Sequence, residues 1–234
     1  FRSGTHTINP SLYKLPYDMV RDFAPVTLIG STPFVLGVHP SLPVKSVNEL
    51  IQYAKANAGV LNYGSGGQGT PPHLATELLK SMAGGIQMVH VPYKNGAAGI
   101  IPALLGNEIM MSFINMSSVL EHLRAGKVKA IAAVPTTRLA ELPQVPTLTE
   151  LGYPNVGTNA WQGLFAPAAT PRPIQDKLFA AVSKVMQASD VQERLQKGMM
   201  TLALSQSPQE WTDSVRQQTQ QWAEVVRVNQ VKID

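Results

Sequence analysis

Cysteine is absent from the 234 residues, so the chain forms neither a disulfide nor a thiolate metal site. Charged residues make up only 15% of the chain, against about 25% in an average protein. The net charge is +4, but the lysines and arginines form no basic stripe, which argues against nucleic-acid binding. No apolar run reaches the roughly 18 residues of a transmembrane helix. No signal peptide begins the chain, so we expect a cytosolic protein or an exported one already processed.

Apolar runs alternate with helical patterns through residues 46–152, and this alternation predicts a parallel sheet covered by helices. The strands expected there are 61–65, 87–93, 109–115 and 128–134. Five helix starts carry a capping pattern, in which a hydroxyl residue precedes Glu or Gln by three positions. These are Ser46–Glu49, Ser118–Glu121, Thr147–Glu150, Ser189–Gln192 and Ser207–Glu210.

Further strands are expected at 23–30, 34–38 and 161–167, and the pattern turns helical from Pro173 onward. One apolar helix stripe contains Ile174, Leu178, Val182, Val185 and Met186, and a second contains Trp211, Val215, Trp222, Val225 and Val226. The last helix has no sheet of its own, so we expect it to pack on the N-terminal part of the chain.

This order predicts an α/β fold of two lobes. Residues 1–37 and 161–234 form the first lobe and residues 38–160 the second, with hinge strands near 34–38 and 161–167. Few strands precede the hinge, and a sheet of normal size needs more. We therefore expect the first lobe to be incomplete at its N-terminus, as in a truncated chain.

A glycine-rich turn, Ser65-Gly66-Gly67-Gln68-Gly69-Thr70, joins a predicted strand to a predicted helix. Thr70 can cap that helix, and Pro71 suits its first position. Backbone N–H groups at a helix N-terminus attract anions. The stretch therefore predicts a cradle for a small carboxylate or phosphate; an ordinary strand-to-helix turn is the alternative.

Enzyme motifs fit this turn poorly. Residues 64–69 satisfy G-x-G-x-x-G, but a dinucleotide site needs an acidic residue after the next strand, where Pro92-Tyr93-Lys94 stand. No Gly-Lys-Ser/Thr follows, so a P-loop is excluded. Tyr63 replaces the first glycine of a nucleophile elbow around Ser65. The sequence favours a non-enzymatic protein, with an α/β enzyme that binds phosphate or a nucleotide at 64–70 as the alternative.

Other polar residues keep two interpretations each. His6 and His73 either donate to an anion or cap local backbone, and Thr70 can be both cap and ligand donor. Asn115 ends a buried strand, and its side chain either contacts a ligand in a cleft or helps to form a turn. Trp161 forms a cleft wall or part of the core. His90 looks structural or exposed. His73 and Glu77 lie four residues apart, but no third ligand is near, so no metal is expected.

Eight ordered segments carry a family signature: 5–13 (THTINPSLY), 15–18 (LPYD), 22–26 (DFAPV), 61–70 (LNYGSGGQGT), 73–74 (HL), 89–94 (VHVPYK), 142–147 (LPQVPT) and 161–167 (WQGLFAP). The chain resembles the periplasmic solute-binding proteins of tripartite tricarboxylate transporters, the Bug family. The resemblance implies a two-lobe periplasmic-binding-protein fold of type II, without catalysis or cofactor, exported to the periplasm. It implies capture of a di- or tricarboxylate, an amino acid or an aromatic acid in an interlobe cleft, delivery to membrane permease subunits, and a monomer when intact.

The resemblance also implies ligand contacts. They are Thr5, His6, Ser65, Gly66, Gly67, Gly69, Thr70, His73, Asn115 and Trp161. A Pro-Gly-Gly type loop after the family's first strand has no counterpart in this chain. In relatives an aspartate often precedes the position of Asn115, where this chain has Ile114. The residues present do not select one carboxylate.

Overall fold

A computed structural model describes residues 1–157 and 159–228, which belong to two compact units. The first unit contains residues 1–32 and the chain from Ala160 onward, and the second contains Pro33–Asn159. The chain crosses between Thr32 and Pro33 rather than near residue 37, because the strand Phe34–Val38 is paired within the second unit's sheet. Both units combine helices and strands, as predicted; the hinge role of 34–38 and 161–167 stays a prediction.

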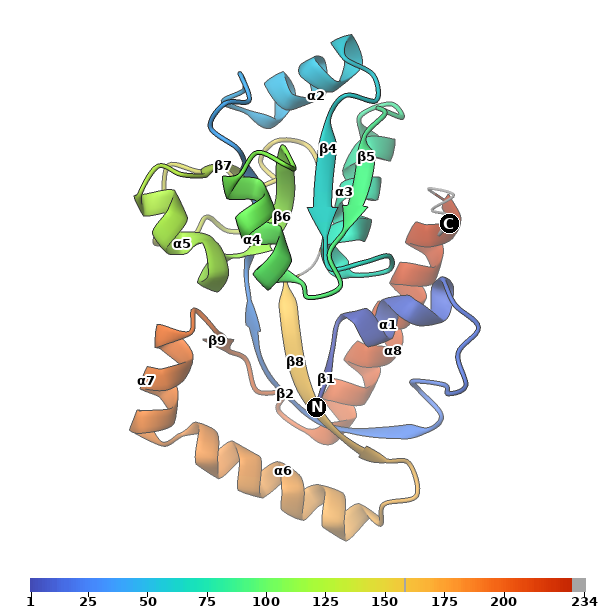
Figure 1. Ribbon diagram of the computed structural model, residues 1–234. Coiled ribbons are helices and arrows are strands. Elements are labelled where there is room, and N and C mark those ends of the chain that lie inside the picture. The colour runs from blue at the N-terminus through green and yellow to red at the C-terminus, as the bar shows by residue number, and fades with distance from the viewer. Residues whose placement is uncertain (158, 229–234) are drawn as a thin grey trace. The chain divides into compact units, whose positions relative to one another are not determined.

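The second unit carries a five-stranded sheet (Figure 1). Its elements are β3 (Phe34–Val38), α2 (Val47–Ala56), β4 (Asn62–Ser65), α3 (Pro71–Met82), β5 (Val89–Pro92), α4 (Ala97–Leu105), β6 (Met111–Asn115), α5 (Met116–Arg124) and β7 (Lys129–Ala133). The strand order is β5-β4-β6-β3-β7. β4 pairs in parallel with β5 and β6, but β3 runs antiparallel to β6 and β7. The sheet is therefore mixed, although the alternating pattern predicted a parallel one.

The first unit carries a four-stranded antiparallel sheet in the order β1-β8-β2-β9. Its elements are β1 (Arg2–Ser3), α1 (Thr5–Ile8), η1 (Asn9–Ser11), β2 (Phe23–Thr32), β8 (Ala160–Pro167), α6 (Arg172–Met186), α7 (Ser189–Lys197), β9 (Thr201–Leu202) and α8 (Pro208–Val228). The long helix α8 lies against α1 and β2, so the C-terminal helix returns to the N-terminal part as predicted (Figure 1).

A tryptophan pair forms the core of the first unit. The rings of Trp161 and Trp211 meet edge to face with centroids 5.0 Å apart, and Met19 and Val215 complete the cluster. A side-chain carbon built on Gly163 would lie 2.8 Å from the Trp211 ring. Only glycine therefore lets β8 pass this close to the indole. The predicted burial of Trp211, Val215 and Trp222 is confirmed.

The apolar stripe of α6 behaves differently. α6 contacts β2, α7 and α8, but these contacts bury none of its residues. Ile174 and Val185 are each about half exposed. The spacing of apolar residues in the sequence located the helix correctly, but this spacing does not show which element covers the apolar face.

Among the described residues, no helix has the length and apolar character needed to cross a membrane.

The capping patterns are confirmed only in part. Ser46 caps α2 by accepting the Glu49 N–H at 3.2 Å, and Ser207 accepts the Glu210 N–H at 3.1 Å in front of α8. The Thr147 pattern forms the same bond but closes a turn. The patterns at Ser118 and Ser189 were wrong as caps, since Asn115 and Ala188 precede those helices. β6 runs straight into α5, so Ser118 falls inside the helix.

Replacing Ser46 by alanine should lower the free energy of unfolding by about 1 kcal/mol, because the Glu49 N–H loses its acceptor. Ser118→Ala is the matched control, since this serine has the same pattern but no capping role. We expect Ser118→Ala to be neutral, as alanine is a good helix former. Urea denaturation of both variants measures the difference, and equal losses would show that the pattern, not the observed bond, governs stability.

Candidate functional site

Three helices begin at one edge of the second unit's sheet. β5, β4 and β6 are neighbours and run parallel, and each is followed directly in the chain by α4, α3 and α5 respectively. Figure 1 shows the arrowheads of β4 and β5 at the same edge. Parallel strands bring their carboxyl ends together, so the N-termini of the following helices gather there with their positive dipole ends. This edge is where an anion would be bound.

The glycine-rich turn uses most of its own amides. Gly67 N–H donates to Ser65 Oγ at 3.0 Å, and Gly69 N–H donates to His73 Nδ1 at 3.3 Å. Thr70 donates both its N–H and its hydroxyl to the Gly67 carbonyl. Gly67 and Gly69 have φ of +118° and +72°, which favours glycine. The turn is therefore a self-bonded structure, whereas the sequence predicted a row of bare amides.

Unpaired donors remain beside the turn. Within the described chain, the N–H groups of Gly66, Ala97 and Ala98 have no acceptor. A side-chain carbon built on Gly66 would lie 3.8 Å from the Gly96 Cα, so the β4–α3 and β5–α4 turns touch. α3 begins with two prolines and lacks two of the amides expected of it. The start of α4, which the sequence did not single out, supplies them instead.

Asn115 adds a side-chain donor at this edge. It is the last residue of β6 and precedes α5, and its amide oxygen is buried without a partner among the described residues. An asparagine amide in this position can donate from Nδ2 to an anion. No Asp or Glu occurs in 65–70, 93–99 or 115–118, and Lys94 lies in the β5–α4 turn. The local charge therefore favours an anion, and a ligand contact at Asn115 stays a prediction.

The Ser65 hydroxyl supports the turn from within. Ser65 is fully buried, and its Oγ lies 2.7 Å from His90 Nε2 as well as bonding to Gly67. His90 stacks on Tyr63, with ring centroids 4.9 Å apart, and lies 4.5 Å from the ring of His73. The sequence missed this role of His90, because only the register Tyr63↔His90 of the paired strands brings it under the turn.

A polar cluster anchors α3 to β4 behind this stack. The Tyr63 hydroxyl donates to Glu77 at 2.6 Å, and Lys80 Nζ donates to both Glu77 oxygens. Burial and the Glu77 charge raise the pKa of Tyr63 far above its ordinary value, so it stays a donor. Burial alone would raise the pKa of Glu77, but the bonds from Lys80 and Tyr63 outweigh it and lower that pKa. The carboxylate therefore stays ionised.

Three predicted contacts lie in the first unit. Thr5 and His6 begin α1, and a side-chain carbon built on Gly4 would lie 3.3 Å from Trp161 Nε1, so these residues are neighbours. Burial and the Arg2 charge lower the pKa of His6. Trp161 is a core residue, 5% exposed, and its indole N–H is buried without a partner among residues 1–157 and 159–228. A ligand contact from Thr5, His6 or Trp161 stays a prediction.

Within the second unit, the structure brings the other predicted residues to one place. Ser65, Gly66, Gly67, Gly69, Thr70 and His73 form the turn and its support, and Asn115 lies at the same sheet edge. Their roles differ from the expectation. Gly66 offers an unused N–H donor and Asn115 has an unpaired amide oxygen, but Ser65, Gly67, Gly69 and His73 bond within the turn.

Comparison with known proteins gives a consistent result. The family model described as tripartite tricarboxylate transporter family receptor matches residues 1–231. Protein BugT of Bordetella pertussis is 32% identical over 220 residues, which are 94% of this chain and 66% of that protein. Three curated relatives, 32–38% identical, are matched over 54%, 63% and 66% of their own length. The chain therefore spans less than two thirds of these relatives.

Two similar solved structures are of proteins with a carboxylate. R. palustris Rpa4515 with adipate has a TM-score of 0.87 and 30% identity, over 99% of this chain and 77% of that chain. MatC from Rhodopseudomonas palustris with bound malate has a TM-score of 0.85 and 31% identity, over 95% of this chain and 76% of that chain. The two-lobe periplasmic-binding-protein fold expected from the sequence is confirmed by this likeness.

Glu77→Gln should remove a pH-dependent part of the stability. Because the pKa of Glu77 is lowered in the folded protein, its contribution is complete above the ordinary glutamate value of about 4.3 and is lost as the pH falls through the folded value. The difference in unfolding free energy between wild type and Glu77→Gln should therefore shrink in acid. Urea denaturation between about pH 7 and about pH 3 measures it.

Glu121→Gln is the control for this prediction. That carboxylate is 78% exposed and pairs with Arg124 on α5, so its removal should change stability little at any pH. A Glu77→Gln difference that stayed constant across the pH range would contradict the assignment of an ionised, bonded Glu77.

Proposed function

Because the chain belongs to the tripartite tricarboxylate transporter receptor family, we propose that it binds a small carboxylate at the edge of the sheet where α3, α4 and α5 begin. The observation that carries the proposal is the set of unused N–H donors there, which belong to Gly66, Ala97 and Ala98. Adipate and malate, the ligands named for two similar structures, are both dicarboxylates. A di- or tricarboxylate is therefore the preferred class, ahead of amino acids and aromatic acids.

The donors suit this chemistry. A carboxylate accepts several hydrogen bonds and gains from the helix dipoles behind them. Bonds to a charged group contribute about 1.5–3 kcal/mol each, so a few of them suffice for tight binding. Backbone amides recognise the charge and geometry of the carboxylate group but not the rest of the ligand. Residues outside this edge must therefore select among carboxylates, and we propose Thr5, His6 and Trp161 for part of that role.

A receptor of a transport system delivers its ligand and does not transform it. We propose accordingly that the chain is a non-enzymatic solute-binding protein of the periplasm that passes the carboxylate to membrane permease subunits, and that the intact protein is a monomer. The alternative of a nucleotide-binding enzyme gains no support from the site. β5 is followed by Tyr93-Lys94-Asn95 and offers no acidic residue for a ribose.

Adipate and malate should raise the thermal unfolding midpoint of the chain, because a ligand that binds only the folded state stabilises it by mass action, by about 2.7 kcal/mol at 100 times Kd. Differential scanning fluorimetry with increasing concentrations of each acid measures the shift. Adipamide, which has the same carbon chain without charge, is the control. No shift with any di- or tricarboxylate, or a larger shift with ATP than with any of them, would sink the proposal.

Ala97→Pro should weaken carboxylate binding without unfolding the protein. Ala97 is the first residue of α4, where proline is tolerated, and the change deletes one unused N–H. Loss of one bond to a charged ligand predicts an affinity lower by about tenfold or more. Ser189→Pro is the control, since Ser189 is the first residue of α7 in the first unit. Calorimetric titration with malate compares them, and equal affinities would exclude Ala97 as a donor.

A further inference from the structure

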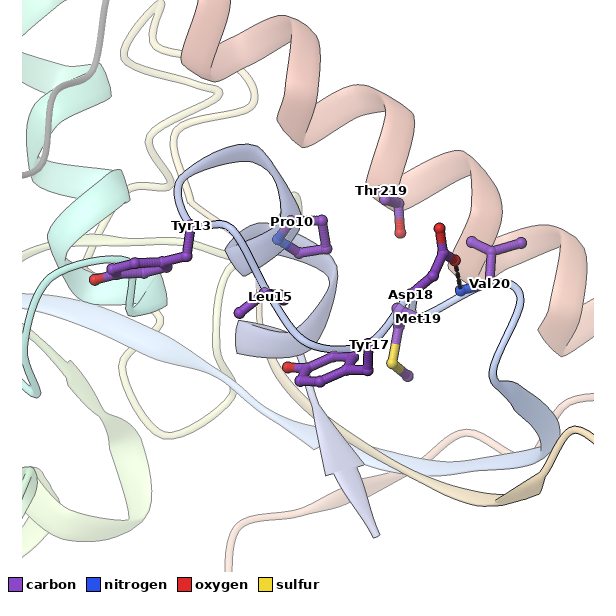
Figure 2. Close-up of a pocket in the computed structure, with 8 residues that line it drawn as sticks. All are labelled: Pro10, Tyr13, Leu15, Tyr17, Asp18, Met19, Val20 and Thr219. Atoms are coloured by element: carbon purple, nitrogen blue, oxygen red, sulfur yellow. Dashed lines mark hydrogen bonds between the residues drawn. The ribbon is translucent and has the colours of Figure 1, made fainter.

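A separate cavity of about 280 Å³ lies in the first unit (Figure 2). It is formed by the segment that follows α1 and by one residue of α8. Its lining residues are Pro10, Tyr13, Leu15, Tyr17, Asp18, Met19, Val20 and Thr219. None of them belongs to the turns at which we place the carboxylate. The cavity therefore needs an explanation of its own.

The cavity wall mixes polar and apolar surface, and part of its apolar surface is fixed in place. Met19 is 1% exposed and belongs to the tryptophan core, so it gives the wall a rigid base. The Tyr17 ring packs edge to face on Phe23, with centroids 5.8 Å apart and planes at 85°. Leu15 and Pro10 add aliphatic surface. Such a wall suits a short hydrocarbon body and offers an aromatic ring beside it.

Two polar side chains of the wall, Asp18 and Thr219, offer acceptors. Asp18 Oδ1 accepts the N–H groups of Val20 and Arg21, each at 2.8 Å, while Oδ2 has no partner in the described part of the chain. Figure 2 shows the Asp18 carboxylate directed toward the helix that carries Thr219. The Thr219 hydroxyl already donates its proton to the Val215 carbonyl at 2.8 Å, so it can only accept.

Arg21 interacts with two carboxylates: its bond to Asp22 is the main cause of its raised pKa, and the Asp18 charge adds to the rise. The Arg21 guanidinium is bonded to Asp22 at 2.7 Å, and that bond lowers the pKa of Asp22 to about 2. The side chains of this ion pair are not among the lining residues. The two carboxylates Asp18 and Asp22 and the one guanidinium of Arg21 therefore leave a net charge of −1, with the Asp18 carboxylate at the cavity beside a tyrosine ring.

We propose that this cavity is a second binding site, specific for a small organic cation of the alkylammonium class. An ammonium group can donate to Asp18 Oδ2 and Thr219 Oγ1 and gains from the negative face of a tyrosine ring. Its hydrocarbon chain fits against Leu15, Met19 and Pro10. A carboxylate is repelled here, so the two sites of the protein select opposite charges.

Titration with n-butylammonium chloride tests the proposal, with n-butanol and butyrate as probes of the same length but different charge. Protein-observed NMR or calorimetry should detect binding of the ammonium ion and markedly weaker or no binding of butanol. Equal binding of butanol and butylammonium would overturn the proposal, as would no detectable binding of the cation. Butyrate binding that leaves the signals of Tyr17 and Met19 unchanged belongs to the other site.

Asp18→Asn is the decisive variant, because asparagine keeps the Oδ1 acceptor for Val20 and Arg21 but loses the charge. We expect butylammonium affinity to fall by about tenfold or more, as for the loss of a bond between charged groups. Asp190→Asn, an exposed position on α7, changes the net charge equally and should have no effect. Unchanged affinity in Asp18→Asn, or an equal loss in Asp190→Asn, would overturn the assignment.

Thr219→Lys gives an independent test that leaves the Asp18 turn intact. Its tethered alkylammonium chain should fill the cavity from α8 and abolish butylammonium binding. Butylammonium that still bound with wild-type affinity would place the cation elsewhere. Adipate or malate binding should be unchanged in both variants, so this proposal and the proposed carboxylate site fail or succeed separately.

Discussion

The parallel pairing of β4 with β5 and β6 is the constraint on which the candidate site depends. Parallel neighbours place their carboxyl ends at one edge, and each strand here leads at once into a helix. Three helix N-termini therefore meet without any charged side chain being needed. The antiparallel strand β3 joins the same sheet between β6 and β7 and does not disturb this edge.

Polar contacts beneath the glycine-rich turn hold its shape. Ser65 bonds to Gly67 and His90, and the Tyr63–Glu77–Lys80 cluster fixes α3 against β4. The bonds within the turn use the polar groups of Ser65, Gly67, Gly69 and His73, which the sequence suggested for the ligand. The donors that remain unused belong to Gly66 and the first turn of α4. A rigid support with a few open amides is the arrangement expected of a preorganised anion site.

The proposed binding by backbone amides has a consequence for ligand choice. Amides recognise the carboxylate group that all such ligands share, so the same turn can serve receptors for different acids. Adipate and malate in two similar structures fit this view. The proposed cation cavity beside Asp18 belongs to the other unit and uses side chains.

The sequence by itself determined the elements, the glycine-rich turn, the return of α8 to the N-terminal part and the family, because periodicity, caps and motifs are local signals. Only the tertiary structure decided the antiparallel direction of β3, the exposure of the α6 stripe and the failure of the Ser118 cap. It also decided that His90 lies against Ser65 and that Ala97 keeps a free amide. Strand register and helix packing bring together residues that are far apart in the chain, and no local sequence pattern encodes such a pairing.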